Sequence, residues 1–135
     1  MGSIKTIPTE ITLYGVKVSI EIDDQWCEDN NVHGCFFPME NKIVLAKKYK
    51  RDNKWVAYQK QSIYATFIHE LTHCLLYMSG SSSWDKENFV NNFSGLLNQV
   101  IDEIIKSNRA VSSRSRSTRT GSGRVQKDSK KNKDL

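Results

Sequence analysis

Apolar and polar residues alternate over the first part of the chain. The apolar side chains occupy every second position on either side of a Tyr14-Gly15 turn: Ile11, Leu13, Val16, Val18, Ile20 and Ile22. A period of two with β-branched residues predicts a β-hairpin over residues 3–22.

Two shorter apolar runs follow a polar, turn-forming segment at residues 23–31. The first, residues 34–37, is stopped by Pro38, and the second, residues 42–45, follows a turn at residues 40–41. Proline cannot donate a hydrogen bond to a neighbouring strand, so the first run is expected at a sheet edge. Together these segments predict a small, mostly antiparallel sheet of three or four strands.

The hydrophobic period changes to three and four residues from about Lys54. The positions that follow this period are Trp55, Tyr58, Ser62, Ala65, Ile68, Leu71, Leu75 and Met78. Such spacing predicts a helix, and Gly80 is well placed to end it in the left-handed conformation. A second helix is predicted from a cap near Ser83 to Asn108, with Phe89 and Phe93 facing the core.

Residues 109–135 differ in composition from the rest of the chain. They contain nine basic and two acidic residues, whereas residues 1–108 contain eleven basic and thirteen acidic residues. Ser, Arg, Lys, Gly and Thr dominate the segment and cannot bury a core, so a disordered basic tail is expected. The tail has two interpretations: it binds nucleic acid or an acidic partner, or it is a solubilising end.

Composition also excludes several classes of protein. No apolar run approaches the roughly 20 residues that span a bilayer, and no signal-peptide pattern opens the chain, so neither a membrane protein nor secretion is expected. The three cysteines form no short pair, which favours reduced thiols and a cytoplasmic location.

The first predicted helix contains the sequence His69-Glu70-Leu71-Thr72-His73, an H-E-x-x-H motif. Residues four apart share one helix face, so both imidazoles can bind one Zn²⁺ ion. The carboxylate of Glu70 can then act as general base on a metal-activated water. The alternative is a helix with two ordinary histidines, but burying two unpartnered imidazoles and a carboxylate would be costly.

A third zinc ligand is expected from the next helix. Glu87 is the favoured candidate, with Asp85 second and His33 third; Glu87 can also be just a favourable acid near a helix N-terminus. Asn91, four residues after Glu87, can accept a hydrogen bond from the second ring nitrogen of a ligand histidine.

Oxyanion stabilisation has two candidates, Tyr77 on the face of His73 and His33 before the edge strand. A peptide substrate can add to that edge strand, residues 34–37, by β-augmentation. Cys74 is expected to point away from the metal as a small core residue.

His69-Glu70-Leu71-Thr72-His73, followed by Glu87-x-x-Val90-Asn91-x-Phe93, resembles the small phage and mobile-element zincins of the ImmA/IrrE-like group. The resemblance covers residues 5–106 and is specific across residues 62–97. It implies a compact sheet before the metal-binding helix, a Glu as third zinc ligand, and a zinc-dependent peptidase acting on repressor-type proteins in bacteria or phages.

The sequence therefore predicts an α+β fold: a small, mostly antiparallel sheet followed by two helices, with a minimal zincin-like metallopeptidase domain at residues 1–108. His69, His73 and Glu87 are the expected ligands, and Glu70 the expected base. Two other hypotheses stay open. One is a non-catalytic binding module with a structural metal, which engages a host protein or nucleic acid through its tail; the other is hydrolysis of a non-peptide amide.

Overall fold

The computed structural model describes residues 6–120, and describes side chains as far as Val111. The chain divides into two compact units, Met1–Gln99 and Val100–Leu135. The strands within residues 6–120 and the three residues of the candidate metal centre, His69, His73 and Glu87, belong to the first unit.

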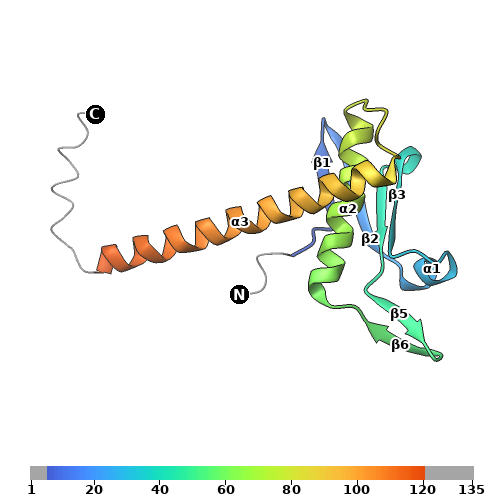
Figure 1. Ribbon diagram of the computed structural model, residues 1–135, viewed down its shortest axis with the longest axis horizontal. Coiled ribbons are helices and arrows are strands. Elements are labelled where there is room, and N and C mark those ends of the chain that lie inside the picture. Colours follow the sequence, from blue (N-terminus) through green and yellow to red (C-terminus); the bar gives the residue numbers. More distant parts are fainter. Residues whose placement is uncertain (1–5, 121–135) are drawn as a thin grey trace. The chain divides into compact units, whose positions relative to one another are not determined.

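A four-stranded sheet forms the centre of the first unit (Figure 1). Its strands are β1 (Glu10–Leu13), β2 (Val16–Ile22), β3 (Gly34–Phe37) and β4 (Lys42–Leu45), in the order β1-β2-β4-β3. β1–β2 and β3–β4 are antiparallel, and β2–β4 is parallel. The α+β class and the mostly antiparallel sheet are confirmed, and the parallel central pair is an addition that the sequence pattern did not predict.

The predicted hairpin and edge strand are both present. Tyr14 and Gly15 have φ angles of 53° and 77°, a pair of positive values that suits a two-residue hairpin turn. β3 lies at the edge of the sheet, and Pro38 opens a short 3₁₀ helix, Pro38–Glu40, directly after it. Because proline has no N–H to donate, it ends the ladder at the position where the sequence indicated.

Helix α2 (Lys60–Met78) packs against β3 and β4 and carries the H-E-x-x-H motif. Its core-facing side chains include Phe67, Ile68 and Cys74, so the expected buried position of Cys74 is confirmed. The helix ends as predicted: Gly80 has a φ of 82°, and its N–H donates to the carbonyl of Tyr77 while the N–H of Ser81 donates to Leu76. This pair of bonds is a Schellman ending, for which glycine has no steric penalty.

The predicted start of this helix is wrong. The residues expected in its first turn instead form β6 (Lys54–Ala57), which pairs with β5 (Lys48–Arg51) in a second hairpin, and α2 begins six residues after Lys54. Asp52 and Asn53, at the turn, have φ angles of 52° and 64°. Asp and Asn tolerate the left-handed region, so this dipeptide was the local signal for a tight turn.

The polar segment at residues 23–31 contains a short helix, α1 (Asp24–Asp29), where only a turn was expected. The side chain of Asp23 caps it by accepting from the N–H of Trp26. Two carboxylates of α1 then bind backbone N–H groups of the second hairpin: Asp24 accepts from Lys47 and Lys48, and Glu28 accepts from Lys50.

Helix α3 (Glu87–Thr120) begins four residues after Ser83, the predicted start, and ends twelve residues after Asn108, the predicted end. The prediction that Phe89 and Phe93 face the core is also wrong, since they are 45% and 43% exposed. The neighbouring positions, Val90 and Ser94, are buried instead, which is a shift of one residue around the helix. The rest of the predicted tail, residues 121–135, lies outside the described residues.

No helix within residues 6–120 combines the length and the apolar character that crossing a membrane requires.

Cutting the chain after Asn108 should leave the first unit folded and the candidate metal centre intact. The reason is that Val111 is 56% exposed and every residue of the centre precedes Gln99. The measurement is cooperative thermal unfolding and zinc stoichiometry of the truncated chain. Any affinity of the full chain for an oligonucleotide should disappear with residues 109–135; affinity that survives the cut would assign nucleic-acid binding to another surface.

Candidate metal centre

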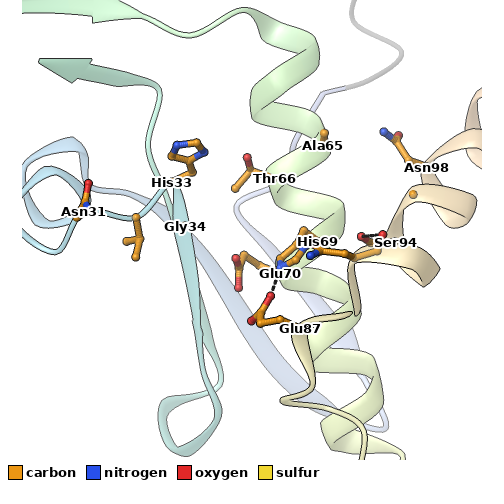
Figure 2. Close-up of a pocket in the computed structure, with 13 residues that line it drawn as sticks. Asn31, His33, Gly34, Ala65, Thr66, His69, Glu70, Glu87, Ser94 and Asn98 are labelled. Carbon is orange, nitrogen blue, oxygen red and sulfur yellow. Dashed lines mark hydrogen bonds and ion pairs between the residues drawn. The ribbon is translucent and has the colours of Figure 1, made fainter. Parts of the chain in front are cut away.

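Two helices bring the three predicted ligands together. His69 and His73 lie four residues apart on α2, and Glu87 is the first residue of α3, after the turn that reverses the chain. The Nε2 atoms of the two histidines are 3.2 Å apart. One oxygen of Glu87 lies 3.2 Å from Nε2 of His69, and the other lies 3.1 Å from Nε2 of His73. Figure 2 shows the contact between His69 and Glu87.

These distances fit a single Zn²⁺ ion. Two ligand atoms at 2.0–2.1 Å from a tetrahedral ion are about 3.3 Å apart, close to the 3.2 Å between the two Nε2 atoms and to the distance from each Nε2 atom to the Glu87 oxygen that it contacts. Two imidazoles and a carboxylate are also a donor set that zinc prefers, and one that leaves a fourth position for water or substrate. His69, His73 and Glu87 are therefore a suitable ligand set.

A backbone carbonyl fixes the orientation of one imidazole. Nδ1 of His73 is hydrogen-bonded to the carbonyl oxygen of Trp84. When Nδ1 donates this bond, Nε2 of the neutral ring carries a lone pair, and it faces a carboxylate oxygen of Glu87. Two acceptors face each other unfavourably unless a cation or a proton lies between them, and a bound cation would satisfy both.

At His73, the backbone carbonyl of Trp84, and not the side chain of Asn91, accepts the hydrogen bond from the second ring nitrogen. Asn91 lines the groove beside His69, and its backbone carbonyl accepts from the hydroxyl of Ser94. Among the described residues, no hydrogen bond joins the Asn91 side chain to either imidazole. A pattern of side chains could not indicate Trp84, because the acceptor is a backbone carbonyl placed by the turn between the two helices.

Glu70 is only 8% exposed and lies beside His69 and Glu87 (Figure 2). The pKa of its carboxyl is raised to about 7, mainly by burial and in addition by the negative charge of Glu87. The positive charge of His73 and a backbone hydrogen bond with Phe36 lower this pKa and oppose the shift in part. A carboxyl with a pKa near neutrality can both accept and return a proton, as a general base requires.

Burial lowers the pKa of His69, and the charge of His73 lowers it further. The carboxylate of Glu87 acts in the opposite direction. A lowered pKa keeps the imidazole of His69 neutral near pH 7, which is the form that binds a metal.

The remaining candidate residues, His33 and Tyr77 for oxyanion stabilisation and Asp85 as a ligand, lie in different surroundings. His33 lines a groove together with His69 and Glu70. Tyr77 instead packs edge-on against Phe36 and Trp84, as part of an aromatic cluster. Asp85, the second choice for a ligand, lines a smaller cavity beside Glu70 but is outside the ligand group.

Cavities lie on both sides of the ligands along β3. The larger has a volume of about 550 Å³ and extends past His33, and the smaller, of about 290 Å³, extends past Trp84. Gly34, Glu70 and Glu87 line both cavities. Figure 2 shows the larger one between His33 on one side and Ser94 and Asn98 on the other.

Gly34 permits α2 to approach the edge strand closely. A Cβ atom at this position would lie 2.9 Å from Cγ2 of Thr66 and 2.9 Å from the carbonyl oxygen of Val44. Such contacts are too short for any side chain, so the close packing of β3 and α2 beside the centre depends on glycine here.

Comparisons of the chain with protein-family models, with curated proteins and with solved structures find no match.

Proposed function

We propose that this protein is a zinc-dependent peptidase. The observation that carries the proposal is the convergence of Nε2 of His69, Nε2 of His73 and the carboxylate of Glu87, with the buried carboxyl of Glu70 beside them. Three donors and an adjacent general base are the parts that hydrolysis by a metal-activated water requires. The H-E-x-x-H resemblance to the ImmA/IrrE-like zincins supports the same reaction.

Each residue has a separate task in this proposal. A bound Zn²⁺ ion supplies Lewis acidity, which lowers the pKa of water and polarises a carbonyl group. Glu70 accepts the proton from the attacking water and then transfers it to the leaving amine. The carbonyl of Trp84 holds His73 in the tautomer that binds metal through Nε2.

The substrate is proposed to lie along β3. This strand is at the sheet edge, and the two cavities extend along it on either side of Glu70. An extended peptide that pairs with such an edge would place a carbonyl group next to the metal centre. His33 lines the same groove and is the better placed of the two candidates for oxyanion stabilisation, because Tyr77 is engaged in the aromatic cluster.

The proposed setting is the cytoplasm of a bacterium, or of the host if the chain is encoded by a phage. Cys27, Cys35 and Cys74 are free thiols, and a reducing compartment preserves thiols in this form. A repressor-type protein is the substrate that the resemblance suggests.

The test is zinc analysis of the purified full-length chain together with hydrolysis of a peptide library made from a bacterial proteome. We expect about one zinc ion per chain and cleavage at a limited set of peptide bonds, detected by mass spectrometry. Chelation with 1,10-phenanthroline should stop cleavage, and added Zn²⁺ should restore it.

Two results would contradict the peptidase proposal. If the purified chain bound no zinc, the zinc centre on which the proposal depends would be refuted. A fully loaded chain that cleaves no peptide and no native protein would favour the alternative, a binding module in which the metal is structural.

A further inference from the structure

The β5–β6 hairpin concentrates the positive charge of the first 108 residues. Six of their eleven basic residues lie within residues 47–60, against one acidic residue, Asp52. The cations of the hairpin and its base are Lys47, Lys48, Lys50, Arg51, Lys54 and Lys60, and all six are exposed. The remainder of the first 108 residues is negatively charged overall, so the hairpin is a distinct basic surface.

These cations are not neutralised by partners in the described part of the chain. No Lys or Arg of residues 47–60 forms an ion pair with a carboxylate of residues 6–111. The acidic side chains that contact the hairpin, Asp24 and Glu28, bind backbone N–H groups at the edge of β5. They hold the hairpin in place while its basic side chains remain available to an anionic partner.

The aromatic rings of the hairpin favour a peptide over a single-stranded nucleic acid. Nζ of Lys50 lies 5.1 Å from the ring centre of Trp55, and the guanidinium of Arg51 lies 5.8 Å from that of Tyr49. Tyr49 also packs against Tyr58, at 4.7 Å between ring centres. Nucleobases bind by stacking on open aromatic faces, and a cation or another ring next to each of these rings leaves less open ring surface for stacking, although Trp55 is 41% exposed.

The base of the hairpin adjoins the groove of the metal centre. His33, which lines that groove, packs against Tyr58 at 5.3 Å between ring centres, and Tyr58 packs in turn against Tyr49 of β5. Figure 1 shows β6 leading into α2, the helix that carries the two histidines. A substrate peptide that extends from the groove past His33 would therefore reach the basic surface next.

We propose that the β5–β6 hairpin is an exosite that binds an acidic segment of the protein substrate, next to the groove of the metal centre. The inference rests on the proposed peptidase function and adds a substrate class to it: proteins with a run of Asp or Glu beside the cleaved segment. Opposite charges at such a surface increase the association rate and the selectivity more than they increase affinity.

The test compares two charge-reversal variants of the full-length chain. Lys48→Glu/Lys54→Glu alters the hairpin, and Lys17→Glu/Lys106→Glu makes the same change in net charge at exposed positions elsewhere. The probe is a fluorescein-labelled decapeptide of glutamate, measured by fluorescence anisotropy at 150 mM salt. The hairpin variant should bind it about tenfold more weakly than the parent, and the control variant within about threefold.

A second probe, a labelled ten-nucleotide single-stranded DNA, separates the two classes of anionic partner. If the hairpin variant bound the oligonucleotide more weakly than the parent but bound the peptide equally well, the proposal would be overturned and the hairpin would be assigned to nucleic acid. Equal binding of the peptide by both variants would also overturn it, since the affinity would then belong to other basic residues.

Binding needs no turnover, so this result can be read even if the chain hydrolyses nothing. If hydrolysis is found, attaching a glutamate segment to a cleaved peptide should lower KM for the parent and the control variant while leaving kcat unchanged. For the hairpin variant, the glutamate segment should not lower KM. A peptidase that shows no such gain would refute the exosite and leave the proposed function standing.

Discussion

Replacing Glu70 by glutamine is expected to lower peptide hydrolysis by about 10²–10⁴-fold, the usual contribution of a positioned general base. The amide has nearly the size of the carboxyl group but cannot accept a proton from water. Zinc should remain bound, because the three ligand atoms belong to His69, His73 and Glu87. The measurement is kcat/KM for a peptide that the parent cleaves, with the zinc content of each preparation determined in parallel.

An exposed carboxylate provides the matched control: Glu103→Gln removes one negative charge and should hydrolyse at the parental rate. A zinc-loaded Glu70→Gln variant with parental activity would exclude Glu70 as the base. Loss of zinc from this variant would instead show that Glu70 helps to hold the metal.

The metal-free Glu70→Gln variant offers an independent check of the burial of Glu70. Because the folded-state pKa of about 7 exceeds the ordinary value of 4.5, the group is protonated in both states and imposes no penalty on folding below pH 4.5, and stability falls as the pH rises from 4.5 through 7. Its ionisation costs the metal-free fold about 3 kcal/mol at pH 8. The variant should therefore be more stable than the parent at pH 8 and similar to it at pH 4, as measured by urea unfolding.

Replacing Glu87 by alanine is expected to weaken zinc binding by more than about 100-fold, since even partners of metal ligands contribute about 10–100-fold. The carboxylate of Glu87 contacts Nε2 of both histidines, and its removal leaves two donors where three were present. Glu87 is exposed, so the substitution should leave the fold largely intact. The measurement is competition for zinc with a chromophoric chelator.

Asp85→Ala is the matched control, because Asp85 is an exposed acid two residues earlier in the chain and lies outside the ligand group. It should change zinc affinity by less than about threefold, the range of a screened surface charge. Equal losses from the two variants, or no loss from Glu87→Ala, would exclude Glu87 as a ligand.

Local features of the fold could be predicted from the sequence. The β1–β2 hairpin follows from strict alternation around Tyr14-Gly15, the edge position of β3 from Pro38, and the end of α2 from Gly80. Each depends on the conformational preferences of a few consecutive residues, which are the same in any surrounding structure.

Helix boundaries were predicted less well where packing overrides local periodicity. Trp55 and Tyr58 continue the helical spacing of α2, but Trp55 pairs with Lys50 in a hairpin that α1 binds through its carboxylates. On α3 the buried positions are Val90 and Ser94, next to the phenylalanines that the pattern favoured. The rotation of a helix about its axis depends on the neighbouring elements, which periodicity alone does not specify.

The sequence by itself determined that His69 and His73 share one helix face with Glu70 beside them, because the α-helix fixes the relation of residues four apart. Only the tertiary structure decided which acid meets the two imidazoles, which carbonyl orients His73, and that a basic hairpin adjoins the groove. These contacts join residues that are distant in sequence or use the backbone. Their geometry depends on how the turn after Gly80 and the packing of α2 on β3 place whole elements against each other.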